Sequence, residues 1–197
     1  GPAGMRAALF CHQRGHSVVL FEKTEKLGGQ LYHTDYTSFK WTLRRYRDYL
    51  KEQLVKTGVE VRMNTEASPE MIESEGFDAV ILALGAEPKK PNVRGAENAR
   101  WNVLNVYGSA DKLGENVVVV GGSESGVETA LYLCETGHKV TVLSRRDSLA
   151  YDATPVHFRE TVVEAWDSFG DAFRSIKNAT TTEIGEGFVK YTDSEGE

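Results

Sequence analysis

One segment of this chain occurs twice, and the two copies lie a constant 122 positions apart. The first copy, residues 1–23, reads GPAGMRAALFCHQRGHSVVLFEK, and the second, residues 123–145, reads SESGVETALYLCETGHKVTVLSR. Each copy runs from a glycine turn through an amphipathic helix and a Gly-His turn into a β-branched strand. This order opens a βαβ dinucleotide-binding unit, so the repeat predicts two such units and two bound nucleotides. A protein that holds two dinucleotides usually passes electrons between them.

Helical and strand patterns alternate along the whole chain, which predicts an α/β fold with a parallel sheet in each half. The fold class expected is therefore two consecutive Rossmann-like dinucleotide-binding units. The buried face of the helix at 39–57 is expected to carry its regularly spaced apolar residues, Leu43, Tyr46, Leu50 and Leu54. We expect helices at 3–14, 39–57, 68–73, 124–136 and 155–168, the last capped by Thr154, strands at 17–21, 59–63, 77–84, 116–120 and 139–143, and short antiparallel strands within 172–192.

Turn-forming residues mark a boundary near the middle of the chain, where Pro88, Pro91 and Gly95 follow an apolar strand pattern. The domain prediction is a first dinucleotide-binding unit at 1–90, a connection at 91–114 and a second dinucleotide-binding unit at 115–197.

Both units are expected to be truncated. A dinucleotide fingerprint is a strand, then G-x-G-x-x-G, then a helix. The second copy has the strand 116–120 and the first glycine, Gly121, whereas the same offset places their counterparts before Gly1. The strand pattern at 188–192 is followed by turn residues, which predicts a partner strand beyond it. The first unit is thus expected to lack its first strand, and the second its last strands.

The first glycine turn, formed by Gly1, Pro2, Ala3 and Gly4, is expected to bind a pyrophosphate. Its glycines let the backbone approach the phosphates, and the helix that follows supplies amide donors and a positive dipole end. Glu22 ends the strand of the same copy, where a carboxylate accepts hydrogen bonds from the ribose hydroxyls of an adenosine. The alternative for Glu22 is an ordinary solvated residue at a strand end.

The second glycine turn departs from the pattern, because Ser123 stands where the fingerprint has its second glycine. A serine adds a Cβ where the backbone approaches the pyrophosphate, but its hydroxyl can donate to a phosphate oxygen. A strand and a helix are still expected on either side of this turn, so the segment is still predicted to bind a dinucleotide. The residues expected to contact the nucleotide are Gly121, Gly122, Ser123, Glu124, Ser125 and Gly126.

The end of the strand in the second copy predicts the nucleotide of the second unit. Where the first copy has Glu22, the second has Ser144 followed by Arg145 and Arg146. A carboxylate there would repel the 2′-phosphate of NADP(H), whereas arginine binds it through charge-assisted hydrogen bonds. The first unit is therefore expected to take FAD, and the second NADP(H) rather than NAD(H). The alternative is a solvated pair of loop arginines.

Composition excludes several other functions. The net charge of −6 argues against nucleic acid or an anionic membrane as a partner, and no apolar run is long enough to span a bilayer. Cys11 and Cys134 are isolated, which excludes a CxxC redox or metal motif and fits the cytoplasm. His12 and His16 have a metal-ligand spacing, but Gly15 separates them, so no metal site is expected. No Ser-His-Asp order and no pair of carboxylates stands out as a catalytic arrangement.

The series of motifs resembles the two-dinucleotide flavoprotein reductases. Its most similar group is the C-terminal part of the NADH:flavin oxidoreductases fused to an old-yellow-enzyme barrel, such as 2,4-dienoyl-CoA reductase and trimethylamine dehydrogenase. The resemblance covers nearly the whole chain. It rests on residues 1–5, on Glu22-Lys23, on 27–31 (LGGQL), on 77–88 (FDAVILALGAEP) and on the second fingerprint.

The resemblance implies further contacts. Lys23, Gly29, Gln30 and Leu31 would contact FAD, and Ala83 and Gly85 belong to a segment similar to the family's flavin-proximal "ATG". Leu84 replaces the usual threonine there, which removes a hydroxyl contact. The stretch 144–147 (SRRD) is similar to the NADPH-binding "HRRD" of thioredoxin reductases, whose redox cysteine pair has no counterpart here.

By the same resemblance the chain is an electron-input module that passes a hydride from NAD(P)H to FAD. FMN, an iron–sulfur cluster and the substrate would belong to a barrel portion of the polypeptide outside this sequence. The alternatives are a stand-alone pyridine-nucleotide–flavin reductase, the small subunit of a glutamate-synthase-like complex, and a structural ADP-binding domain without turnover.

Overall fold

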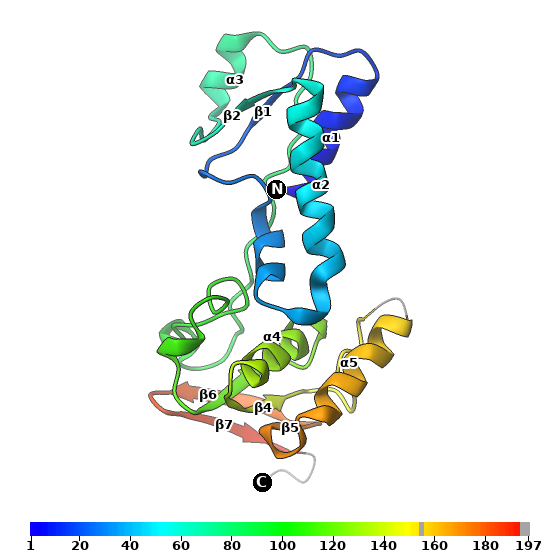
Figure 1. Ribbon diagram of the computed structural model, residues 1–197. Helices are drawn as coiled ribbons and strands as arrows, with labels where there is room; N and C mark the ends of the chain where they lie inside the picture. The colour runs from blue at the N-terminus through cyan, green and yellow to red at the C-terminus, as the bar shows by residue number, and fades with distance from the viewer. Residues whose placement is uncertain (154–155, 194–197) are drawn as a thin grey trace. The chain divides into compact units, whose positions relative to one another are not determined.

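The computed structural model describes residues 1–153 and 156–193, and the chain forms two compact units (Figure 1). The first unit is Gly1–Glu87 and the second is Pro88–Glu197. Both units contain parallel strands and helices, which confirms the α/β class. No helix among the described residues combines the length and apolar character needed to cross a membrane.

The first unit pairs two strands in parallel, β1 and β2, with Val19 opposite Glu60. The predicted helix signals operate as expected, since Gly58 ends α2 in the left-handed region (φ 70°) and Ser68 Oγ accepts from Met71 N at 3.2 Å to start α3. The elements are α1 (Pro2–Gln13), β1 (Val19–Phe21), the 3₁₀ turns η1 (Gly29–Asp35) and η2 (Ser38–Lys40), α2 (Trp41–Thr57), β2 (Glu60–Arg62) and α3 (Pro69–Glu75).

The core of the first unit lies between α1 and α2 and is formed by Met5, Ala8, Leu9, Leu50, Leu54 and Val59. The buried face of α2 differs from the prediction. Leu43 and Tyr46 are 40% and 41% exposed, and the buried position is taken by Arg47. The spacing of apolar residues did not show that this end of α2 faces η1, where Asp35 pairs with Arg47.

The apolar run at 77–84 was predicted to be a strand, and that prediction is wrong. This segment belongs to no strand in the part of the chain that the structure describes. Ile81, Leu82 and Leu84 are 62%, 77% and 86% exposed. A segment becomes a strand only where a neighbouring strand completes the hydrogen-bond ladder, and the sheet of the first unit consists of β1 and β2 alone among the described residues. The apolar composition predicted a buried strand, but composition does not show whether a second strand is available to pair with it.

The second unit contains a three-stranded parallel sheet in the order β3-β4-β5, with Asn116 opposite Lys139 and Val140 opposite Phe173. Its α4 is buried along most of its length. The elements are η3 (Ala96–Asn98), η4 (Ala110–Lys112), β3 (Asn116–Val120), α4 (Glu124–Glu135), β4 (Lys139–Leu143), α5 (Val156–Ser168), η5 (Gly170–Ala172), β5 (Phe173–Ile176), β6 (Thr180–Gly185) and β7 (Phe188–Thr192).

The end of the second unit is only partly as predicted. β6 and β7 form the expected antiparallel hairpin, but β5 is parallel to β4. A strand that follows a crossover helix returns parallel to the strand before it, and α5 is that helix. The predicted cap of α5, Thr154 with Pro155, lies outside the described residues.

Candidate functional site

The first glycine turn presents unused backbone donors at the start of α1. The first helical bond runs from Met5 N to Gly1 O at 3.0 Å, so the N–H groups of Ala3 and Gly4 have no acceptor within the helix. Pro2 occupies the first helical turn, and that turn contains no acidic residue and no side-chain cap. The N-terminus of α1 is thus an uncapped, partially positive helix end of the kind that binds phosphate.

Glu22 lies beside this turn and is held there by hydrogen bonds. Its Oε1 accepts from Thr24 N at 3.0 Å and from Thr24 Oγ1 at 2.9 Å, while Oε2 lies 3.3 Å from Gly1 N. Burial raises the pKa of Glu22, but hydrogen bonds, those from Thr24 foremost, lower it below its ordinary value. The side chain is therefore an ionised, oriented acceptor at neutral pH.

The predicted GGQ loop folds against the same glycine turn. Gly28 and Gly29 have positive φ angles of 137° and 53°, and a Cβ on Gly29 would lie 2.8 Å from Gly1 Cα. Gln30 Nε2 donates to Ala86 O at 3.0 Å. The structure thus brings the predicted FAD-contacting residues Gly1, Gly29 and Gln30 together, with Leu31 half-buried and Lys23 exposed.

The predicted flavin-proximal segment approaches the first glycine turn at one residue. A Cβ on Gly4 would lie 3.4 Å from both Ala83 Cβ and Leu20 Cδ1. Gly85, which has a φ of 79°, is exposed. Ala83 therefore lies beside the turn, whereas Gly85 lies in the exposed part of the segment, where its positive φ angle favours glycine.

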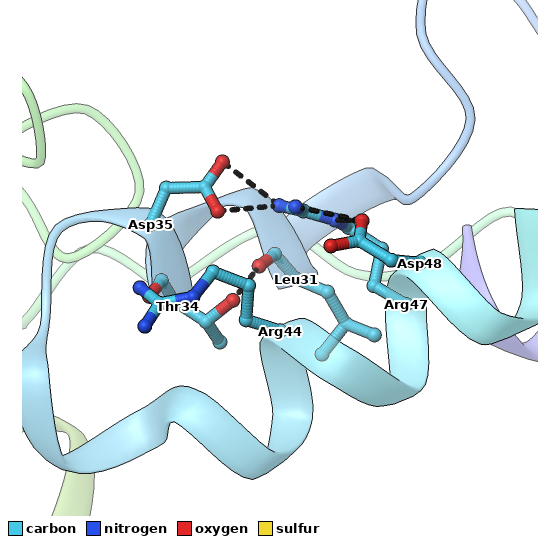
Figure 2. A network of polar contacts seen from close by, with 6 residues as sticks. All are labelled: Leu31, Thr34, Asp35, Arg44, Arg47 and Asp48. Carbon is cyan, nitrogen blue, oxygen red and sulfur yellow. Dashed lines mark hydrogen bonds and ion pairs between the residues drawn. The ribbon is translucent and has the colours of Figure 1, made fainter.

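A charged network that the sequence analysis missed supports the GGQ loop from α2. Arg47 donates to both oxygens of Asp35 at 2.8 Å and to Asp48 at 2.9 Å (Figure 2). Arg44 donates to Thr34 O at 2.9 Å in the same network. Arg47 is only 6% exposed, and its pKa is raised because the two carboxylates outweigh its burial. Arg47 precedes Leu50 by three residues and Leu54 by seven, and this helical spacing is the sequence signal that could have placed it on the buried face of α2.

Replacing Arg47 with methionine is expected to lower the free energy of unfolding by about 2 kcal/mol, since it removes the charge-assisted bonds while keeping most of the buried volume. Urea unfolding followed by circular dichroism measures the change. The matched control is Arg45→Met on the same helix, because Arg45 is exposed and contacts only the Trp41 ring among its described charge and ring partners. Equal losses in the two variants would contradict the structural role assigned to Arg47.

The second glycine turn leaves no room for side chains at two of its glycines. A Cβ on Gly126 would overlap the carbonyl oxygen of Gly121, and one on Gly122 would lie 2.6 Å from Ser144 Cβ. Ser123, by contrast, has ordinary extended angles (φ −69°, ψ 172°), so its Cβ is accepted without strain. Ser123 makes no side-chain cap, and the first bond of α4 runs from Val127 N to Ser123 O at 3.0 Å.

The loop after β4, residues 144–153, folds over this second turn. Ala150 N donates to Gly122 O at 2.8 Å, and Glu124 N donates to Asp152 Oδ1 at 2.7 Å. Leu149 is buried against Gly122. A carboxylate that sequence analysis did not single out thus caps α4 from 28 residues away.

Three predicted nucleotide-binding residues lie at the start of this loop, and they divide into two kinds. Ser144 is buried, and its hydroxyl donates to Ser148 O at 3.3 Å and accepts from Arg146 N at 3.2 Å, so it shapes the loop. Arg145 and Arg146 are exposed, and neither forms an ion pair with another described residue. The Arg146 guanidinium lies 5.4 Å from the centre of the Tyr151 ring. Both arginines are therefore available to an anion.

The cysteines have no reactive arrangement. Both are free, and burial raises the pKa of Cys134 to about 11, which keeps the thiol neutral at pH 7. Cys134 Sγ lies 3.4 Å from Ala172 O, as expected for a structural thiol. Among the residues that the structure describes, no group of three His, Cys, Asp or Glu side chains could hold a metal ion.

Comparison with known proteins identifies relatives that match nearly the full length of this chain. A family model described as pyridine nucleotide-disulphide oxidoreductase matches residues 1–196. An NADH oxidase of Thermoanaerobacter brockii is 40% identical over an alignment of 186 residues that covers 91% of this chain and 28% of that protein. A cinnamate reductase of Clostridium sporogenes is 31% identical over 99% of this chain and 29% of its own length.

Solved structures agree with these relatives. A 2-naphthoyl-CoA reductase matches with a TM-score of 0.92 and 29% identity, covering 100% of this chain and 30% of that chain. The histamine dehydrogenase of Rhizobium sp. 4-9 has the same fold, with a TM-score of 0.80 at 22% identity. The chain therefore spans less than a third of the length of these relatives. The matches confirm the resemblance inferred from the motifs.

Proposed function

Because the chain belongs to the pyridine nucleotide-disulphide oxidoreductase family, we propose that it is the electron-input module of a flavin-dependent oxidoreductase. FAD (or ADP) would occupy the first unit and NAD(P)H the second. When both are bound, the nicotinamide supplies a hydride and the flavin accepts it. The protein's own part is to bind and orient the two nucleotides, which is consistent with the absence of a predicted catalytic acid or base.

The residues of the first unit fit an adenosine diphosphate group. The free amides of Ala3 and Gly4 would donate to the phosphates, and the ionised Glu22 would accept from the ribose hydroxyls. The observation that carries the proposal is the distance of 3.3 Å between Glu22 Oε2 and Gly1 N. At this distance the carboxylate that would accept from the ribose hydroxyls lies next to the helix end whose amides would donate to the phosphates. Lys23, Gly29, Gln30 and Leu31 would complete this site.

The second unit fits a nicotinamide dinucleotide with a 2′-phosphate. The amides of Ser125 and Gly126 precede the first helical bond of α4 and can donate to a pyrophosphate. Arg145 and Arg146 offer guanidinium groups at the end of β4 that form no ion pair with a described residue, which favours NADP(H) over NAD(H).

Replacing both Arg145 and Arg146 with alanine is expected to weaken NADPH binding about 30-fold and NADH binding less than about threefold, because charge-assisted bonds to the 2′-phosphate are lost. Calorimetric titration of the two nucleotides into the variant and the parent chain measures the difference. Equal weakening of both would show that the arginines do not read the 2′-phosphate.

The relatives are longer proteins, so we propose that this module works within a larger enzyme. Electrons would pass onward to an iron–sulfur cluster, FMN and an unsaturated substrate in the barrel portion. The relatives that are named cinnamate reductase and 2-naphthoyl-CoA reductase support that kind of acceptor. The two free cysteines support a reducing cytoplasm as its location.

A structural nucleotide-binding domain is the second candidate, and one observation favours it. Asp152 already accepts from the amide of Glu124, which a pyrophosphate on the second turn would use. Calorimetric titration of FAD, ADP, NADPH and NADH into the chain separates the two. Binding of ADP or FAD together with a nicotinamide nucleotide supports the electron-input module. Retention of ADP or FAD with no nicotinamide binding supports the structural domain.

A further inference from the structure

The internal repeat extends further than the matching letters indicate. The loop after β1 and the loop after β4 keep the same offset of 122, so that Gly28 corresponds to Ala150 and Gln30 to Asp152. Both Gly28 and Ala150 have positive φ angles, 137° and 47°. Leu31 N donates to Gly28 O at 3.2 Å, and the matching bond runs from Ala153 N to Ala150 O at 3.0 Å.

Each loop also folds onto the glycine turn of its own unit. In the first unit Gly29 packs against Gly1, and in the second Ala150 N donates to Gly122 O at 2.8 Å. The two loops are therefore the same structural element, although few of their side chains are alike. Ala150 adopts its left-handed angles without being a glycine, which shows that the surrounding contacts hold the second loop in place.

The two loops differ in charge at the matched position. The first carries the neutral amide of Gln30, which donates to Ala86 O, and the second carries the carboxylate of Asp152, which accepts from Glu124 N at 2.7 Å. An amide N–H donates one strong hydrogen bond, and Glu124 N–H stands at the start of α4, where a pyrophosphate would bind. A carboxylate at this position competes for the donor and repels the phosphates.

From this comparison we propose that Asp152 is a positioning residue that lowers the affinity of the second unit for its dinucleotide, an inference that rests on the proposed function. The carboxylate caps α4 in place of Ser123, which makes no cap of its own. Binding requires the carboxylate to give up Glu124 N–H. The chemistry of the two units explains the difference, because a flavin stays bound between turnovers whereas a nicotinamide nucleotide must exchange at each one.

The test is the substitution Asp152→Asn, which keeps an acceptor oxygen and removes the charge. Both NADPH and NADH are expected to bind about fivefold more tightly and by similar factors, because the pyrophosphate is common to them. The gain is expected to shrink between 50 mM and 500 mM salt, since a charge repulsion is screened. The charge-matched control is Asp111→Asn, an exposed residue of η4 in the same unit, which is expected to leave both affinities unchanged.

The outcomes separate this proposal from the proposed function. Tighter binding by the Asp152→Asn variant, including binding that the parent chain lacks, supports the proposal. Unchanged or weaker binding by that variant, with a parent chain that binds, overturns the role of Asp152 and leaves the proposed function standing. If neither protein binds NADPH or NADH while circular dichroism shows both folded, the proposal and the nicotinamide site are overturned together.

Discussion

Replacing Gly126 with alanine is expected to destabilise the second unit by about 3 kcal/mol and to abolish its binding of NADPH and NADH. The added Cβ would overlap the carbonyl oxygen of Gly121. That oxygen belongs to the backbone of the glycine turn, so it cannot rotate away as a side chain can. Either α4 must move away from the turn or the turn must open, and both changes displace the amides that would hold the pyrophosphate.

The matched control for this prediction is Gly4→Ala in the first copy. A Cβ on Gly4 would lie 3.4 Å from Ala83 Cβ and Leu20 Cδ1, which is ordinary van der Waals contact. Among the described residues, no backbone carbonyl of another element lies within 4 Å of that position, in contrast to the Gly121 carbonyl at Gly126. We expect this substitution to change the free energy of unfolding by less than about 1 kcal/mol.

Urea unfolding and calorimetric titration of both variants measure these effects. ADP binding by the Gly126→Ala chain is the internal control, because the first unit is unchanged in it. Equal damage from the two substitutions would mean that the glycine turns of the two copies are packed alike, contrary to the contacts described here.

Replacing Glu22 with glutamine is expected to weaken ADP and FAD binding about 100-fold and to leave NADPH binding unchanged. Glutamine keeps one acceptor oxygen, but it loses the charge that strengthens the bonds to two ribose hydroxyls, and each tenfold loss corresponds to about 1.4 kcal/mol. Calorimetric titration of ADP measures the loss. An unaltered ADP affinity would assign Glu22 a role only in holding Thr24.

The same carboxylate gives the first unit a defined pH dependence. The folded chain lowers the pKa of Glu22 from its ordinary value of 4.5, so between the two values the unfolded chain binds more protons than the folded one. The stabilisation is therefore complete above the ordinary pKa and is lost as the pH falls through the lowered one. In the Glu22→Gln variant this component of the acid-induced loss of stability is expected to be absent, as urea unfolding at a series of acid pH values measures.

Local signals in the sequence predicted most of the elements because they act over a few residues. Gly58 ends α2 and Ser68 starts α3 through their own backbone angles and hydrogen bonds. The repeat predicted α1 and β1 together with α4 and β4. Pairing of strands is not local, which is why the apolar run at 77–84 was mistaken for a strand and β5 was expected to be antiparallel.

The candidate sites divide in the same way. The glycine turns, Glu22 and the arginines at 145 and 146 were found from residue types at the spacing of a fingerprint. Arg47 and Asp152 were not found, because each acts on an element distant in the sequence. Arg47 supports the GGQ loop from α2, and Asp152 caps α4 from the loop after β4.

The sequence by itself determined the fold of two dinucleotide-binding units, because the repeat is visible in residue types, and the residues at the strand ends predicted a different nucleotide for each unit. Only the tertiary structure decided how alike the two copies are. It showed that the loops at 22–31 and 144–153 are one element in two versions, and that Gly126 but not Gly4 is closed to a side chain. Backbone angles and distances between remote atoms carry that information, since positive φ at Ala150 and the overlap at Gly121 depend on packing rather than on residue type.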